Sequence, residues 1–223
     1  MADITLENIT LALANSSEIL GKDKYFNSAI LIPLIEVEDK YHLLFEKRAN
    51  NIRQGGEVSF PGGEFDSKKD QTLRQTAIRE TSEELGIPVD KINIIGKIGT
   101  LVAPMGITVD PFLGFLSIKD LNEISIDKNE VEKIFLVPVD HFLNKKPDEY
   151  TVKLEVHPSY TDKKGKEIEL LPVQKLGLPP KYSKPWKNGF HRILVYNSTE
   201  EVIWGITAEI VYELCRMIHP INE

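Results

Sequence analysis

The stretch that constrains this chain most is residues 62–87, where a Gly-Gly turn precedes a segment rich in glutamate. Asp70 or Thr72 can cap a helix start there, and Thr72 with Gln75 fits a capping box. Gly86 suits a left-handed helix end. Small or apolar residues recur at four-residue spacing, as on a packed helix face; they are Leu73, Ala77, Thr81 and Leu85. The sequence therefore predicts one amphipathic helix that ends at Gly86.

Three carboxylates flank the apolar face of this expected helix. Glu80, Glu83 and Glu84 fall within an arc of roughly 100°. Such side chains repel one another and destabilise the helix unless a cation or an arginine neutralises them. Their oxygens suit Mg²⁺ or Mn²⁺, which usually bind together with substrate phosphates. A solvated acidic face is the alternative, but the glycines of the preceding turn let backbone approach a ligand closely, which favours a metal site.

Together these residues resemble the Nudix signature, G-x5-E-x7-R-E-U-x-E-E-x-G-U, in which U is bulky and apolar. Residues 79–87 match its second half, except that Thr81 stands at an apolar position. The first half departs, because Gln71 stands where the signature has glutamate and the glycine lies two residues too far upstream. In the family that glutamate mainly orients the arginine, and here Asp70 or Asp66 is available for this task.

The Nudix resemblance implies metal-dependent hydrolysis of a phosphoanhydride, with Mg²⁺ or Mn²⁺ as the cofactor. It implies that four groups bind the metal, namely the Gly62 carbonyl and the side chains of Glu80, Glu83 and Glu84. Arg79 would orient this acidic cluster. Glu80 or Glu130 would accept a proton from the attacking water, because Nudix enzymes often place a further acidic residue in the region of Glu130. Glu132 is the second candidate there, and either residue can instead be an exposed strand residue.

The segment before the turn resembles a narrower pattern, LLTxR followed by a spaced arginine and G-x-V-x-FPGG, which marks the coenzyme A pyrophosphatase branch of the family. Phe45 replaces its threonine, and the first arginine comes one residue later than usual. Arg48 and Arg53 are the candidate substrate-binding residues, since guanidinium groups hold phosphate oxygens by forked hydrogen bonds. Taken singly, such an arginine is more often a surface or salt-bridge residue.

A second part of the chain, residues 103–114, also resembles the coenzyme A branch. Met105 and Phe112 are candidates for an apolar wall beside the pantetheine chain, with ordinary core packing as the alternative. Pro111 indicates an edge strand or a bulge. Further along, the loop LGLPPKYSKPWKN either covers an adenine or a 3′-phosphate, or is simply solvated.

The resemblance to this branch implies that coenzyme A and water give 3′,5′-ADP and 4′-phosphopantetheine. Two alternatives stay open at this point. One is a pyrophosphatase for ADP-ribose, dinucleotides or damaged nucleotides. The other is a Nudix module that senses a nucleotide without cleaving it, which the intact glutamate set argues against.

For the fold, we expect an α/β protein with one domain over residues 1–223. The Nudix resemblance covers about residues 28–140 and implies a mixed sheet sandwiched between helices. Outside it we expect a helix within residues 4–20, an antiparallel extension over residues 151–196 and a C-terminal helix within residues 202–218. Five residues are expected to dock that last helix on the sheet: Trp204, Ile206, Ile210, Leu214 and Met217.

Composition narrows the class of partner. The formal net charge of −7 argues against a broad nucleic-acid-binding surface. The one cysteine, Cys215, cannot form an intrachain disulfide. No apolar run approaches the length of a membrane span, and the N-terminus does not read as a signal peptide. We therefore expect a cytoplasmic protein with a small-molecule substrate and no nucleic-acid or membrane partner; a homodimer is compatible with the sequence.

Overall fold

The structure is a computed structural model that describes residues 19–104, 106–198 and 200–218. The helix expected within residues 4–20 and the candidate Met105 lie outside these described residues, apart from residues 19 and 20. The centre of the molecule is an eight-stranded sheet with the order β3-β2-β1-β7-β5, to which β4, β6 and β8 add by pairing with β1, β7 and β2. Its strands are β1 (Phe26–Val37), β2 (Lys40–Arg48), β3 (Val58–Ser59), β4 (Gly62–Glu64), β5 (Ile92–Lys97), β6 (Leu101–Ala103), β7 (Ile107–Leu116) and β8 (Val131–Pro138).

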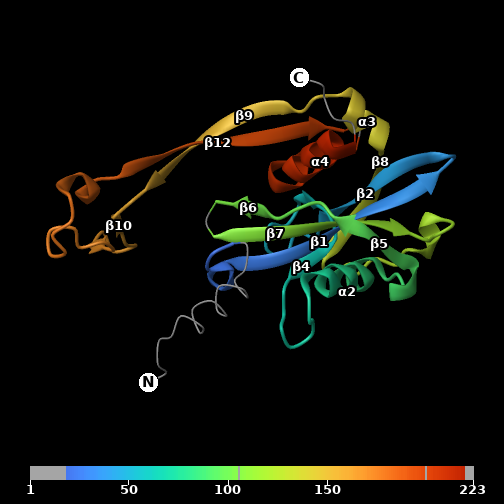
Figure 1. Ribbon diagram of the computed structural model, residues 1–223, viewed down its shortest axis with the longest axis horizontal. Coiled ribbons are helices and arrows are strands. Elements are labelled where there is room, and N and C mark those ends of the chain that lie inside the picture. Colours follow the sequence, from blue (N-terminus) through green and yellow to red (C-terminus); the bar gives the residue numbers. More distant parts are fainter. Residues whose placement is uncertain (1–18, 105, 199, 219–223) are drawn as a thin grey trace, which may run out of the picture.

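The central sheet is mixed, as predicted, because β1 runs parallel to β7 and the remaining pairs are antiparallel. Side chains of β1 alternate between two hydrophobic clusters. Leu31 and Ile35 belong to the cluster under α2 (Leu73–Leu85), whereas Ile32 belongs to the cluster under α4 (Gly205–Ile218). Figure 1 shows the two helices on opposite sides of the sheet. Burial on both faces explains why β1 reads as a continuous apolar run.

Local signals around α2 are largely confirmed. The Thr72 hydroxyl accepts a hydrogen bond from the Gln75 N–H at 3.3 Å, and Gly86 ends the helix with φ of 63°. The capping box is not closed, since the Gln75 side chain accepts instead from the Gln71 N–H at 2.7 Å. The helix therefore begins and ends where the sequence predicts.

The predicted packing face of α2 is also confirmed. Ala77, Thr81 and Leu85 are fully buried, and Leu73 packs partly against the same cluster. The Thr81 hydroxyl donates to the Ala77 carbonyl at 2.7 Å. A threonine can therefore occupy an apolar position of the signature, because the helix itself satisfies its hydroxyl.

Of the two settings expected for Pro111, the edge strand is wrong and the bulge is supported. Pro111 lies on β7, an inner strand that pairs with β1 on one side and with β5 and β6 on the other. The partner chain spans four residues from Lys97 to Leu101, whereas β7 spans three from Phe112 to Val109, so one extra residue stands opposite this part of β7. Residues 92–103 do not form one continuous strand, because residues 98–100 separate β5 from β6 beside this proline. The Pro111 carbonyl still accepts from the Ile98 N–H at 3.1 Å. A proline has no backbone N–H to donate to a neighbouring strand. It is tolerated on this inner strand because the adjacent strand is interrupted beside it.

The C-terminal helix α4 is present as predicted, but three of its expected docking residues are wrong. Trp204, Ile206 and Met217 are 45%, 37% and 56% exposed. The buried side of the helix carries Thr207, Ala208, Ile210, Val211 and Leu214. The Thr207 hydroxyl also donates to the Val58 carbonyl at 3.0 Å, which ties α4 to β3, just before the Gly-Gly turn.

The antiparallel extension is a long two-stranded excursion, called the hairpin arm here and comprising residues 148–197. After the short helix α3 (Val139–Asn144), β9 (Asp148–Val156) pairs with β12 (Trp186–Asn197), which in turn pairs with β13 (Val202–Trp204). Figure 1 shows the arm leaving the body, with β10 (Ser159–Thr161) and β11 (Glu167–Glu169) near its tip.

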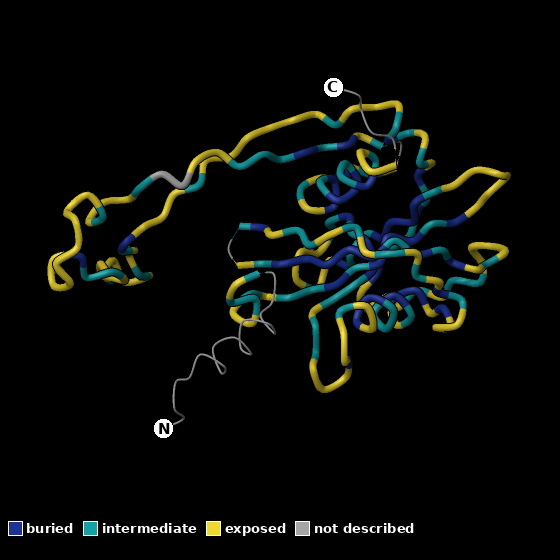
Figure 2. Tube along the Cα trace, viewed as in Figure 1, coloured by how far each residue is buried: buried dark blue, intermediate teal, exposed yellow. Residues whose placement is uncertain are grey.

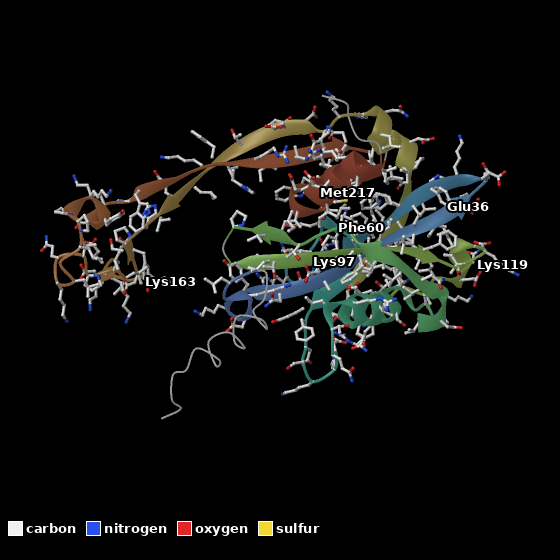
Figure 3. The ribbon with its side chains drawn as sticks, viewed as in Figure 1. Glu36, Phe60, Lys97, Lys119, Lys163 and Met217 are labelled. Atoms are coloured by element: carbon white, nitrogen blue, oxygen red, sulfur yellow. The ribbon has the colours of Figure 1, made fainter. Side chains whose placement is uncertain are left out.

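Burial differs sharply between the body and the hairpin arm. Figure 2 shows buried chain concentrated in the sheet and its covering helices, while the outer arm is mostly exposed or intermediate. Lys163 lies in the outer part of the arm, whereas Phe60 lies inside the body between α4 and the sheet (Figure 3). Within the described residues, no helix is long and apolar enough to cross a membrane.

Candidate active site

Arg79 on α2 joins the acidic residues of the helix to the loop before it. Its guanidinium donates to both carboxylate oxygens of Asp70, with Nε 3.0 Å from Oδ1 and Nη2 2.7 Å from Oδ2. Its Nη1 lies 2.7 Å from Glu80 Oε1 and 3.0 Å from Glu83 Oε2. Asp70 therefore occupies the orienting position for which the sequence offered Asp70 or Asp66. The hydrogen bonds from Arg79 hold the pKa of Asp70 below its usual value.

The Gly-Gly turn contacts two of the glutamates directly. The Gly62 N–H donates to Glu84 Oε2 at 2.9 Å. Gly62 has φ of 153°, and a Cβ there would lie 2.3 Å from the Ala29 carbonyl oxygen. A Cβ on Gly63 would lie 2.6 Å from the carboxyl carbon of Glu80. Gly62 is required because the turn packs against the backbone of β1, and Gly63 is required because the Glu80 carboxylate of α2 packs against it.

A further acidic residue, Glu46 on β2, was missed by the sequence reasoning. It is fully buried, and its Oε1 accepts a hydrogen bond from Ser59 Oγ at 2.9 Å. Glu46 and Ser59 are directly paired across β2 and β3, so their side chains share a face. On the opposite face the rings of Phe45 and Phe60 stack at 4.7 Å between centroids. This aromatic pair anchors both strands and fixes the place where Glu46 meets the turn.

Burial and mutual repulsion perturb the carboxylates. Burial raises the pKa of Glu46 to about 7, with the charges of Glu130 and Glu80 adding to the rise. Burial, reinforced by the charge of Glu46, raises the pKa of Glu84 well above its usual value. Burial also raises the pKa of Glu80, against the hydrogen bond from Arg79. Strongly perturbed carboxylates gathered at one place are typical of functional sites.

The two candidate arginines differ in what they contact. Arg48 follows Glu46 on β2, and its Nη1 lies 3.8 Å from Glu46 Oε1. Its Nε donates to the Arg53 carbonyl at 3.3 Å. The Arg53 guanidinium stacks over the Phe26 ring, 5.4 Å from its centroid. Arg48 therefore lies at the acidic cluster, while Arg53 shapes the intervening loop and directs its charge to the start of β1.

Glu130 and Glu132 also differ in what they contact. Glu130 is exposed in the turn before β8, its charge acts on both Glu46 and Glu80, and its carbonyl accepts from the Ala49 N–H at 2.8 Å. Glu132 accepts instead from Asn50 at 3.1 Å and lies 3.8 Å from Lys47 Nζ. The structure thus brings Glu130, and not Glu132, to the acidic cluster.

For Phe112 the structure favours the core-packing alternative. The residue is 8% exposed and packs in the hydrophobic cluster under α2. The Pro- and Lys-rich loop lies in the hairpin arm, away from α2 and the turn (Figure 1). Neither the phenylalanine nor this loop contributes to the cluster around Glu84.

Among the described residues, no group of three or more His, Cys, Asp or Glu side chains is arranged in this structure so that it could hold a metal ion. Two of the expected ligands, Glu80 and Glu83, contact Arg79 in this structure. The neighbouring cation of Glu80 and Glu83 in this structure is therefore the Arg79 guanidinium.

A family model described as the NUDIX domain matches residues 25–188. This span includes the whole central sheet, the Gly-Gly turn and α2. Fold and site together define a hydrolase that acts on a phosphoanhydride, a class whose members generally use divalent metal ions. The chain belongs to the Nudix family, as its signature predicts.

Curated relatives match over most of the chain. "Nudix hydrolase 3" of Caenorhabditis elegans is 26% identical over 220 residues, covering 96% of this chain and 83% of the relative. The mitochondrial coenzyme A diphosphatase NUDT8 of Mus musculus is 31% identical over 196 residues, covering 86% of this chain and 78% of the relative. Its Homo sapiens counterpart is 35% identical over 127 residues, covering 56% and 53%. The similarity therefore extends well beyond the signature helix.

Proposed function

We propose that this Nudix hydrolase cleaves the phosphoanhydride of coenzyme A, or of a coenzyme A derivative, into 3′,5′-ADP and 4′-phosphopantetheine. The observation that carries the proposal is the arginine-bearing segment before the turn, which resembles the coenzyme A branch. Arg48, at its centre, lies beside the acidic cluster. The two relatives named as coenzyme A diphosphatases support the same substrate class.

The residues present fit Mg²⁺ or Mn²⁺. All the candidate donors are carboxylate or carbonyl oxygens, which these hard cations prefer. The Glu46 Oε2 atom is buried without a hydrogen-bond partner, and the charges of the clustered carboxylates raise one another's pKa. A cation would relieve both conditions. The proposed ligands are the Gly62 carbonyl and three side chains, those of Glu80, Glu83 and Glu84.

When bound, the metal neutralises charge on the diphosphate and acidifies a bound water. The protein positions the side chains that surround the metal. The Gly62 N–H holds Glu84 against the turn, and Asp70 holds Arg79 by two hydrogen bonds. Glu80 and Glu83 would have to rotate away from Arg79 to bind metal. Arg79 is therefore their ion-pair partner in the metal-free protein. Arg48 binds a phosphate oxygen of the substrate.

Two residues remain candidates for the base that accepts a proton from the attacking water. Glu80 lies on α2 within the cluster, and Glu130 lies exposed at its edge. A carboxylate that faces a metal stays ionised at neutral pH, so either residue would act as a base and not as an acid.

Substrate preference tests the proposal. The 3′-phosphate and the pantetheine chain distinguish coenzyme A from ADP-ribose, and a charge-assisted contact to that phosphate is worth about 1.5–3 kcal/mol. We therefore expect kcat/KM for coenzyme A to exceed that for ADP-ribose by roughly one to two orders of magnitude. Chromatography of the products should show 3′,5′-ADP. Higher kcat/KM for ADP-ribose would refute the coenzyme A assignment and leave the phosphoanhydride chemistry standing.

The role of Arg48 can be read from a matched pair of substrates. If Arg48 binds the 3′-phosphate, Arg48→Ala lowers kcat/KM for coenzyme A more than for dephospho-coenzyme A. Equal losses on both substrates assign Arg48 to the diphosphate. Arg53→Ala is the companion variant, because its guanidinium stacks on Phe26 and we expect the smaller loss there.

A further inference from the structure

Glu46 carries an unexplained oxygen atom. Among the described residues, two buried side-chain polar atoms have no hydrogen-bond partner, and Glu46 Oε2 is the one that belongs to an acid. The residue has no exposed surface. A buried carboxylate without compensation is strongly destabilising, so such an oxygen calls for a partner.

The protein groups around Glu46 do not supply that partner. Ser59 Oγ donates to the other oxygen, Oε1. Arg48 approaches the same Oε1, and its Nη1 at 3.8 Å is beyond hydrogen-bonding distance. Both Ser59 and Arg48 are therefore on the Oε1 side of the carboxyl group, and Oε2 has no partner among the described residues.

The side chain nevertheless lies within the acidic cluster. The charges that act on it are those of Arg48, Glu130 and Glu80, and its own charge acts on Glu84. Glu84 is itself 3% exposed. Two carboxylates buried at one place, from β2 and from α2, repel each other, and a cation bound between them would neutralise both.

We propose that Glu46 is a further ligand of the divalent cation at this site, bound through Oε2. The inference rests on the proposed function, because it requires the metal site of α2. It adds a ligand from the sheet, outside the signature helix, whose Oε1 is oriented by Ser59. The cation would then be held between β2 and α2, so that metal binding joins the two elements.

Mn²⁺ binding to the full chain, measured by calorimetry or by the paramagnetic resonance of free Mn²⁺, tests this without relying on turnover. We expect Glu46→Gln to weaken Mn²⁺ binding by about tenfold or more, since even partners outside the ligand shell typically cost about 10–100-fold. Glu132→Gln is the matched control. Its carboxylate lies on the neighbouring strand but pairs with Asn50 and Lys47, so its Mn²⁺ affinity should equal that of the parent.

Glu46→Asp separates direct binding from a charge effect at a distance. The aspartate keeps the negative charge but withdraws the oxygens by one methylene. We expect it also to weaken Mn²⁺ binding about tenfold. Parent-like affinity in Glu46→Asp would overturn direct ligation. Glu46→Asp also decides the matter if circular dichroism shows that Glu46→Gln is not folded.

A double variant tests whether Glu46 and Glu84 bind the same cation. If Glu46 and Glu84 bind one cation, the losses in Glu46→Gln/Glu84→Gln are not additive, because the second change removes a ligand from a site already disabled. Unchanged Mn²⁺ affinity in Glu46→Gln with a loss in Glu84→Gln overturns the inference and leaves the proposed function intact. Unchanged affinity in both variants overturns the metal site itself.

Discussion

Two buried acidic centres on the same sheet can be compared. Asp110 on β7 is 1% exposed, and it lies 2.8 Å from Lys22 Nζ and 2.7 Å from Lys97 Nζ, with a further hydrogen bond from Thr100. Glu46 on β2 is equally buried, yet it has one serine donor and a distant arginine. The two centres are alike in burial and opposite in compensation.

The pKa directions follow that difference. Burial alone would raise the pKa of Asp110, but hydrogen bonds from Lys22, Lys97 and Thr100 hold it below the usual value. For Glu46 burial prevails and raises the pKa to about 7. Burial therefore does not distinguish a structural carboxylate from a functional one. The distinction lies in whether the fold itself supplies the neutralising charge.

The largest expected effect is on catalysis. Glu84→Gln should lower kcat by at least about 100-fold, because loss of even an outer partner of a metal costs about 10–100-fold. Asp110→Asn, tested as the matched change in the other centre, should keep kcat within a few-fold of the parent. Steady-state kinetics in Mg²⁺ or Mn²⁺ measure both. A parent-like kcat in Glu84→Gln would contradict a catalytic role for the acidic cluster.

For thermal stability we expect the larger loss in Asp110→Asn and not in Glu84→Gln. Asp110→Asn removes a carboxylate that two lysines contact, and hydrogen bonds to charged groups are worth about 1.5–3 kcal/mol. For a chain of this size, a loss of about 2 kcal/mol lowers Tm by roughly 4–8 °C. Glu84→Gln relieves repulsion instead, so its Tm in EDTA should equal or exceed that of the parent. A lower Tm for Glu84→Gln than for Asp110→Asn would contradict this assignment.

The smallest expected effect is a pH dependence of the metal-free protein. Between the unfolded value of 4.5 and the folded pKa of about 7, Glu46 binds more protons in the native state, so the free energy of unfolding falls as pH rises. We expect Tm in EDTA to be at least about 3 °C higher at pH 5.5 than at pH 8. The stability contributed by Asp110 is present above its unfolded value of 3.8 and is lost only as pH falls through its lowered folded pKa.

A control is needed for this pH effect, because the whole chain carries a net charge of −7 and is less charged at lower pH. Glu46→Gln removes the titrating group and leaves the remaining charge almost unchanged. Its Tm should therefore depend less on pH than that of the parent. An identical pH dependence in both proteins would assign the effect to overall charge.

Sequence reasoning predicted the helix α2 and its acidic face well, because caps and helical spacing are local. Asp70 was also within reach, since it stands next to the expected position of the missing glutamate. The Glu46 centre was not found, although one signal was present: a charged residue ends the apolar run Leu43-Leu44-Phe45 on a strand that is covered on both faces.

Other misses have a non-local cause. Whether Phe112 lines a pocket or fills the core depends on how closely α2 packs on β7, which no local pattern encodes. Pro111 on an inner strand depends on where a neighbouring strand breaks. The docking side of α4 was misjudged because apolar residues occur around much of its circumference, and only the position of the sheet selects Thr207 and Ala208 over Ile206.

The hairpin arm leaves the body and returns to it at paired residues, Asp148 and Val195. A segment inserted between two neighbouring points can change its length at low cost, because the entropy of closing a loop grows only with the logarithm of its size. Evolution or an engineer can therefore shorten, extend or replace the outer part of the arm without altering the strands that carry the glutamates. The base of the arm, where Leu194 and Tyr196 are buried in the core, is the part that must be preserved.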